Sequence, residues 1–179
     1  MREALKVLAA EGLVRLEPNR GAWVTAITEE EVNEVFPVLK ALESLSGELA
    51  CQNITDAEIR HARKLHDAMI ESYKERNLAL YFEINQQIHH TILLAARNDT
   101  LTNSSEALSA RMLRARYSAN MSEDRWSEAV NEHEQIITYL EARNGQKLSM
   151  VLAEHMRNKQ ASVLRWLRTE AAAEQAAAQ

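Results

Sequence analysis

Four polar residues of this sequence have the types and the spacing to do chemistry together: Asn85, His89, His133 and His155. Each takes an i, i+3, i+4 or i+7 slot among the apolar residues of an amphipathic segment, so each should lie on an inward helix face. Burying an unsatisfied imidazole or amide costs about 1–3 kcal/mol. We therefore expect all four groups to have partners.

Their positions along the chain allow them to meet. Asn85 and His89 are four residues apart and share one helix face. His133 lies 11 residues before Asn144, in an Asn-Gly break, and His155 lies 11 residues after it. If the two flanking helices pack antiparallel, both histidines stand about 16 Å from the turn. The spacing thus predicts that they face each other at one level of a bundle.

An amide oxygen and three imidazole nitrogens are a plausible first shell for Zn²⁺ or Ni²⁺, with positions left open for solvent or a ligand. The alternative is that each histidine is an ordinary core residue with a hydrogen-bond partner. Four convergent positions on three helices favour the metal. For His61, His66 and His90 we expect ordinary, partly exposed side chains, because their directions do not converge.

The elements that must position this cluster are helices. The chain of 179 residues has only four Gly and two Pro, and two of these glycines and one proline fall in the first 21 residues. Six amphipathic segments follow, at about 28–53, 55–75, 77–97, 99–120, 123–143 and 146–169. We predict an all-α fold, an antiparallel six-helix bundle spanning residues 27–170. The low-complexity segment 171–179 is expected to be disordered.

The N-terminal part has a different pattern. Residues 2–11 have helical spacing, and two β-like runs, "LVRLE" and "GAWVTA", flank the turn sequence "PNRG". We predict one helix and a β-hairpin over residues 1–26. Of 21 basic and 26 acidic side chains, four and three lie in residues 1–25, which gives net charge +1 there and −6 beyond. Any contact with a polyanion should therefore come from the N-terminal part.

The composition argues against a disulfide-stabilised, membrane-spanning or secreted protein. The single cysteine, Cys51, excludes an internal disulfide framework and suits a reducing compartment. No run of 18 or so uncharged apolar residues is present, so we expect no membrane span. The charged N-terminal segment has no signal-peptide pattern, and we expect a cytoplasmic protein.

The N-terminal sequence "REALKVLAAEGLVRLEPNRGAWV" resembles the end of the winged helix-turn-helix of the GntR family of transcription regulators, in its R-E-A-L, A-E-G-L-V and R-G-x-x-V patterns. The remainder resembles the FCD effector domain of the FadR subfamily. The matching motif is Asn85, three residues, His89, then Ile92, Ala95 and Asn98, and two later metal histidines of that family match His133 and His155. The resemblance covers about residues 2–168.

The resemblance implies that the helical domain binds a divalent metal and a small organic acid effector, and that the protein is a homodimer. Arg111 matches a family arginine that reaches the effector pocket, where a guanidinium suits a carboxylate. Asn85 stands where aspartate is more frequent, which removes a negative charge from the metal site. Lys40 stands where an arginine is usual.

The resemblance also implies contacts with operator DNA in a full-length form, from Arg2, Arg20 and Gly21 of the recognition helix and wing. The two earlier helices of the winged helix are absent, so we expect DNA binding by this chain to be weak or missing. In that context Arg2 and Arg20 are also readily explained as solvated charges. Our interpretation is that the start was assigned to an internal codon, or that the sequence was shortened.

Three functions follow from these observations. The first is the effector-binding and dimerising part of a metabolite-responsive transcription regulator, which is not an enzyme. The second is a metal-dependent enzyme that uses the Asn/His cluster, although Glu132 and Glu134 point about 100° away from His133 and are poorly placed as a base. The third is a dimerisation module that does not bind DNA.

Overall fold

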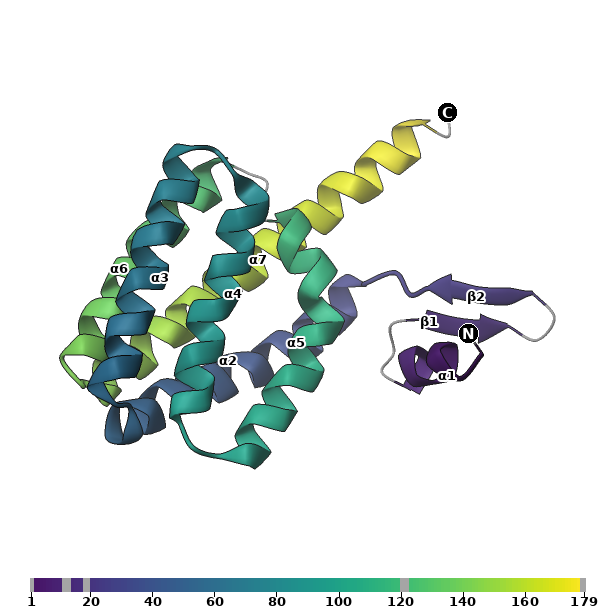
Figure 1. Cartoon of the computed structure of the whole chain (residues 1–179). Helices are drawn as coiled ribbons and strands as arrows, with labels where there is room; N and C mark the ends of the chain where they lie inside the picture. Colours follow the sequence, from purple (N-terminus) through teal and green to yellow (C-terminus); the bar gives the residue numbers. More distant parts are fainter. Residues whose placement is uncertain (1, 11–13, 18–19, 120–122, 178–179) are drawn as a thin grey trace.

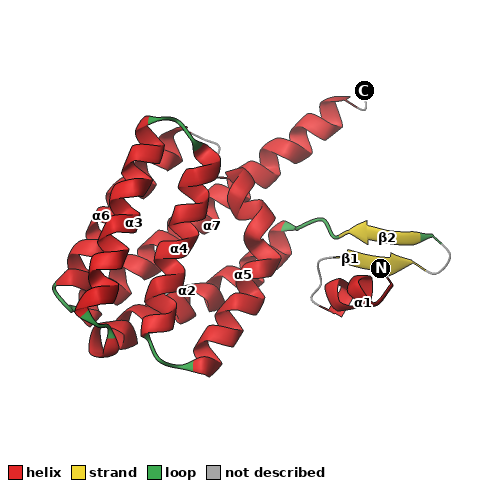
Figure 2. Ribbon diagram, viewed as in Figure 1, coloured by secondary structure: helices red, strands yellow, loops and turns green. Residues whose placement is uncertain are grey.

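The computed structural model describes residues 2–10, 14–17, 20–119 and 123–177. A small N-terminal part stands beside a helical bundle (Figures 1 and 2). The N-terminal part contains α1 (Arg2–Ala10), β1 (Val14–Glu17) and β2 (Gly21–Val24), and the bundle contains α2 (Glu29–Asn53), α3 (Asp56–Lys74), α4 (Leu78–Ala95), α5 (Asp99–Ala119), α6 (Glu123–Glu141) and α7 (Gly145–Ala177). The predicted all-α bundle with a helix and hairpin before it is confirmed.

Polar caps explain why the helix starts were predictable to within one residue. The Thr28 side chain accepts from the Glu31 backbone N–H at the start of α2, and Thr55 forms a full capping box with Glu58 at the start of α3. Asparagine side chains cap three further helices, α4 at Asn77, α5 at Asn98 and α7 at Asn144. Each cap satisfies an N–H group that has no partner inside its helix.

Two apolar clusters hold the bundle together. The larger contains buried residues of α2, α3, α4, α6 and α7, including Ile88, Ile136 and Leu148, and the smaller joins α2, α5 and α7 around Phe36 and Met112. Helices α2 and α7 contribute to both clusters. They are therefore the scaffold against which the other helices are placed.

The N-terminal part packs mainly on itself. Strands β1 and β2 are antiparallel, with Val14 opposite Val24, and α1 lies beside β1. Gly21 has φ +98°, a conformation that favours glycine, at the end of the predicted turn. Residues 18 and 19 of that turn lie outside the described residues. In Figure 1 the hairpin stands away from the bundle and joins it through the segment before α2.

The structure differs from expectation at the C-terminal end. Helix α7 continues to Ala177, so the described residues of the alanine-rich segment 171–177 are helical. Alanine has the highest helix propensity and extends a helix that is already nucleated by packing. Separately, none of the described helices has the length and apolar character needed to cross a membrane.

The close approach of α2 to α7 predicts a sensitive position at Gly47. A Cβ atom placed there would lie 2.5 Å from Leu152 Cδ1 and 3.0 Å from Leu148 Cγ. We expect Gly47→Val to destabilise the protein by about 1–3 kcal/mol through overpacking, measured by urea unfolding. The matched control is Ala41→Val, at an exposed position of the same helix, where we expect a cost below about 1 kcal/mol. Equal stabilities of the two variants would contradict this packing.

Candidate metal and ligand site

Three imidazoles meet inside the bundle. His89 comes from α4, His133 from α6 and His155 from α7, and they are 5%, 0% and 0% exposed. One nitrogen of each ring lies within 4.8 Å of the corresponding atoms of the other two. The ring centroids of His133 and His155 are 4.7 Å apart, so the prediction that they face each other across the α6–α7 turn is confirmed.

The outer nitrogen of each ring has an acceptor beside it. His89 Nδ1 lies 3.1 Å from Glu43 Oε2, His155 Nδ1 lies 2.5 Å from Glu132 Oε2, and His133 Nδ1 lies 2.6 Å from the Ala129 carbonyl oxygen. Because these partners accept hydrogen bonds, each neutral ring carries its proton on Nδ1. All three Nε2 atoms are then left as lone-pair donors.

Two of these Nε2 atoms lie close together. His89 Nε2 and His155 Nε2 are 3.2 Å apart. With both Nδ1 atoms protonated, this contact is not a hydrogen bond between neutral rings, and a cation is needed to make it favourable. Two nitrogens bound to one tetrahedral Zn²⁺ at about 2.0–2.1 Å are about 3.3 Å apart. The His89 and His155 nitrogens therefore have the spacing of two ligands of one divalent ion.

Asn85 and Lys159 complete the cluster. The Asn85 amide nitrogen lies 3.0 Å from His133 Nε2, and its oxygen accepts from Lys159 Nζ at 3.4 Å. Lys159 Nζ also lies 3.5 Å from His89 Nε2. The structure thus places Asn85 with the three histidines, as predicted from the sequence. Its amide nitrogen faces His133, so the oxygen would reach the same point after a half-turn of the amide.

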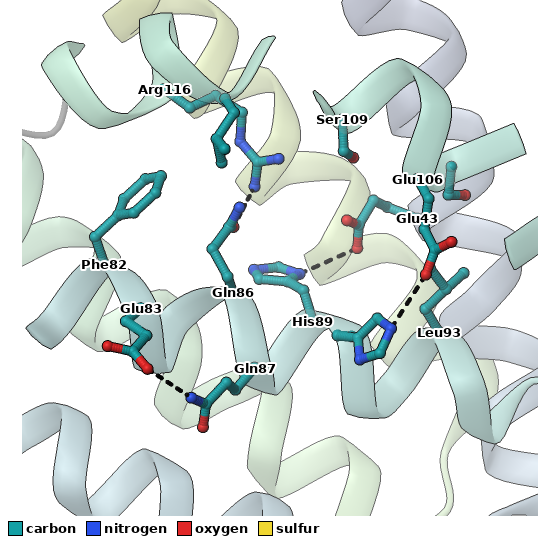
Figure 3. Close-up of a pocket in the computed structure, with 13 residues that line it drawn as sticks. Glu43, Phe82, Glu83, Gln86, Gln87, His89, Leu93, Glu106, Ser109 and Arg116 are labelled. Atoms are coloured by element: carbon teal, nitrogen blue, oxygen red, sulfur yellow. Dashed lines mark hydrogen bonds and ion pairs between the residues drawn. The ribbon is translucent and has the colours of Figure 1, made fainter. Parts of the chain in front are cut away.

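A cavity of about 550 Å³ lies next to the histidines. Residues of α2, α4 and α5 line it, and His89 and Glu43 connect it to the cluster (Figure 3). On the opposite wall Arg116 donates to Gln86 Oε1 at 2.9 Å. The cavity also contains apolar side chains, among them Phe82 and Leu93. It has the size and mixed lining that suit a small organic ligand.

Burial sets the protonation of the site. It lowers the pKa of His89, His133 and His155, which keeps the imidazoles neutral and ready to bind a cation. Burial raises the pKa of Glu43, but His89, Lys159 and Arg116 outweigh this effect and hold that pKa at about 2. Glu43 is therefore a carboxylate that accepts from His89.

The remaining predicted site residues lie elsewhere. Arg111 donates to Glu31 at 2.5 Å and is not among the residues that line the cavity, so its role as an effector contact stays a prediction. Arg20 and Gly21 are exposed at the hairpin turn. The side chain of Arg2 lies outside the described residues. Their contacts with DNA also stay predictions.

The sequence interpretation missed four residues and misplaced one. Glu43, Glu132 and Lys159 support the histidines, and Arg116, grouped in the sequence with a surface arginine cluster, is only 3% exposed. The position of Lys159 could have been inferred from the sequence, because Lys159 lies one helical turn after His155 and shares its helix face. The expectation for His66 was wrong, because it is 0% exposed, whereas His61 and His90 are exposed as expected.

Solved structures place the fold. Escherichia coli McbR/YncC aligns with a TM-score of 0.85 at 18% identity, covering 92% of this chain and 83% of that one. Streptococcus agalactiae GntR aligns with a TM-score of 0.64 at 15% identity, covering 90% and 80%. These likenesses show that the chain shares its fold, a helical bundle behind a helix and a β-hairpin, with both proteins.

The sequence comparisons give the family. The FCD domain profile matches residues 34–158, and the chain belongs to the FCD domain family. The HTH-type transcriptional repressor RspR of Escherichia coli (strain K12) is 27% identical over 167 residues, covering 91% of this chain and 72% of RspR. The probable D-xylose utilization operon transcriptional repressor of Paenarthrobacter nicotinovorans is 26% identical over 159 residues, covering 87% and 68%. These relatives are GntR-type transcription regulators, not enzymes.

The buried histidines predict a dependence of stability on pH. His66 is 0% exposed, neither ring nitrogen has a hydrogen-bond partner, and burial lowers its pKa. Because the folded pKa lies below the unfolded one, stability is complete above about pH 6.5 and falls as pH drops below it. Each such imidazole contributes a slope of about 1.4 kcal/mol per pH unit. Urea unfolding in EDTA, at several pH values from about 5 to 8, measures this slope.

Two matched variants test how much of this pH dependence of the unfolding free energy comes from His66. His66→Gln removes one buried titrating group and should reduce the slope between about pH 5 and 6.5, whatever it does to stability at neutral pH. His61→Gln, at an exposed position of the same helix, should leave the slope as in the wild type. A slope unaffected by His66→Gln would show that this imidazole is not held neutral by burial.

Proposed function

We propose that this chain is the effector-binding and dimerising part of a metabolite-responsive transcription regulator of the FadR subfamily. The observation that carries the proposal is the convergence of three Nε2 lone pairs, each fixed by an acceptor on its own Nδ1. That arrangement is typical of metal sites, where outer partners orient the ligands. Because the histidines lie beside a cavity, a small ligand in the cavity could reach an ion bound there.

Under this proposal, His89, His133 and His155 hold a divalent ion, with Zn²⁺ or Ni²⁺ the best match to three imidazoles. The ion supplies positive charge and open positions for an acid effector. Asn85 contributes an amide and no negative charge, so it holds the ion less strongly than aspartate. Glu43 and Glu132 accept from the outer nitrogens and keep the rings oriented.

The effector of this proposal is a small carboxylate in the cavity beside His89. Arg116 is the better placed arginine for it, because it is buried and lines the cavity, whereas Arg111 is paired with Glu31. Carboxylate capture by a guanidinium also explains why Arg116 donates to the neutral Gln86 side chain. Effector binding then shifts the population between two dimer states with different spacing of their DNA-binding heads.

An enzyme that uses the same cluster is less favoured. Glu132, one of the two acids beside His133, accepts from His155 and forms a two-point ion pair with Arg125. The other, Glu134, is exposed and pairs with Arg63. Neither carboxylate is free to act as a base at the histidine cluster.

Metal binding is testable through Glu43. We expect Glu43→Gln to weaken Zn²⁺ or Ni²⁺ binding by about 10-fold or more, because the neutral amide holds the His89 ring less firmly. The measurement is isothermal titration of metal-free protein with each ion. The matched control Glu34→Gln changes an exposed carboxylate on the same helix and should bind as the wild type. Wild-type protein that binds neither ion would refute the metal site.

The two arginines can be separated in the metal-loaded protein. We expect Arg116→Gln to abolish the thermal stabilisation produced by short-chain carboxylic acids, since it removes the charge that lines the cavity. Arg111→Gln should retain that stabilisation, because Arg111 faces Glu31. The opposite pattern, with loss only in Arg111→Gln, would support the family arginine instead.

A further inference from the structure

The cavity beside His89 offers apolar side chains along much of its length. Phe82 and Leu93 lie on either side of His89 along α4, and Leu113 of α5 also lines the cavity (Figure 3). The eleven residues from Phe82 to Leu93 correspond to about 16 Å of helix. The cavity is therefore longer than a two- or three-carbon acid, and such an acid would leave apolar side chains uncovered.

Tyr117 extends this apolar surface beyond the cavity. It lies one helical turn after Leu113 on α5, and its ring meets the Phe82 ring edge to face, with the centroids 5.1 Å apart. Leu113 is 45% exposed and Tyr117 is 39% exposed. Phe82, Leu113 and Tyr117 together are called the apolar patch below. Apolar surface that solvent reaches at the edge of a cavity is typical of a ligand-binding surface.

Most polar side chains of the cavity lining already have a partner within the lining. Gln87 donates to Glu83, and His90 Nε2 lies 3.2 Å from Glu106 Oε1. The contacts described above, of a guanidinium with a glutamine and of the buried carboxylate with the central histidine, are two further pairs. A ligand with many hydroxyl groups would have to break several of these pairs, whereas an apolar group would not.

The charged side chains of the lining favour a ligand with one carboxylate. Arg116 is the one arginine or lysine among the described residues of the lining, which also contains the acids Glu43, Glu83 and Glu106. A second carboxylate on the ligand would lie near these acids without a second basic side chain to pair with. Juxtaposition of like charges is unfavourable for binding.

We propose that the effector is a small monocarboxylate that carries an alkyl chain or an aromatic ring, and that this apolar group covers the apolar patch. The proposal rests on the effector site argued above and adds the chemistry of the other end of the ligand. Arg116 lies one helical turn after Leu113 on α5, so a ligand whose carboxylate binds Arg116 has the patch within reach. Leu113, an exposed member of the patch that also lines the cavity, is the residue that selects the apolar group.

The test compares acids of equal charge that differ in the group attached to the carboxylate. Metal-loaded wild-type protein is titrated calorimetrically with propanoate, hexanoate, 3-phenylpropanoate and gluconate. Hexanoate and gluconate have the same number of carbons, but gluconate is polyhydroxylated. Each buried methylene group should raise the affinity about fourfold. We therefore expect hexanoate or 3-phenylpropanoate to bind about 10-fold or more tightly than both propanoate and gluconate. The two apolar acids distinguish an alkyl chain from an aromatic ring.

Leu113→Gln is the decisive variant. It replaces an apolar side chain by a polar one of similar size, and it should reduce the affinity of the preferred apolar acid relative to propanoate by about fivefold or more. The matched control is Leu94→Gln, because Leu94 is also 45% exposed but is not among the residues that line the cavity. The control should keep the wild-type preference. Both leucines are exposed, so both variants should melt close to the wild-type temperature in the absence of ligand, which shows that they fold.

The outcomes separate the two proposals. If propanoate or gluconate binds the wild type as tightly as the apolar acids, or if Leu113→Gln keeps the preference, the apolar-group proposal is overturned and the carboxylate effector still stands. Failure of every acid to bind the metal-loaded protein refutes both. Light scattering on the same samples covers the other occupant of the patch. A dimer that is lost in Leu113→Gln would show that a second copy covers the patch, which also overturns the apolar-group proposal.

Discussion

The site is organised by a contact that is unfavourable on its own, the approach of two imidazole lone pairs, His89 Nε2 and His155 Nε2, to 3.2 Å. Glu43 and Glu132 hold the opposite nitrogens as donors, so the rings cannot relieve the contact by exchanging tautomers without losing a buried hydrogen bond. The surrounding helices impose this geometry through packing, not through the site itself. A cation at that point, as in the proposed metal site, would make the contact favourable, and Lys159 Nζ lies 3.5 Å from His89 Nε2.

Four helices are needed to impose this arrangement. Helices α4, α6 and α7 carry the rings, and α2 carries Glu43. The α6–α7 turn fixes the relative height of two rings, with Asn144 capping the start of α7 through its side chain. Gly47 lets α2 lie close enough to α7 for Ser44, the residue after Glu43, to hydrogen-bond with Ser149 at 2.7 Å. Small residues at this crossing therefore determine where the carboxylate meets His89.

Much of this could be predicted from the sequence, and the reason is local. Cap residues such as Thr55 and Asn77 mark helix starts through contacts within a few residues, and counting from Asn144 places His133 opposite His155. The missed residues depend on non-local packing. Arg116 has the sequence context of a surface cluster, and only the packing of α5 against α2 and α7 buries it. The same applies to His66, whose burial depends on the contact of α3 with α6.

The helices around the cavity are also those that lead to the hairpin. Helix α2 carries Glu43 near its middle and Glu29 at its first residue, directly after the segment that follows β2. Its first turn is tied to α5 by the Glu31–Arg111 pair and to α7 by the Glu29–Arg168 pair. These two helices also carry the buried residues Arg116 and Lys159. A ligand bound beside Arg116 in the cavity would thus contact α5, one of the helices tied to the base of the hairpin. Coupling between two sites needs a structural element whose position both sites can change. Helix α2 lies between the cavity and the hairpin and is the candidate for that element.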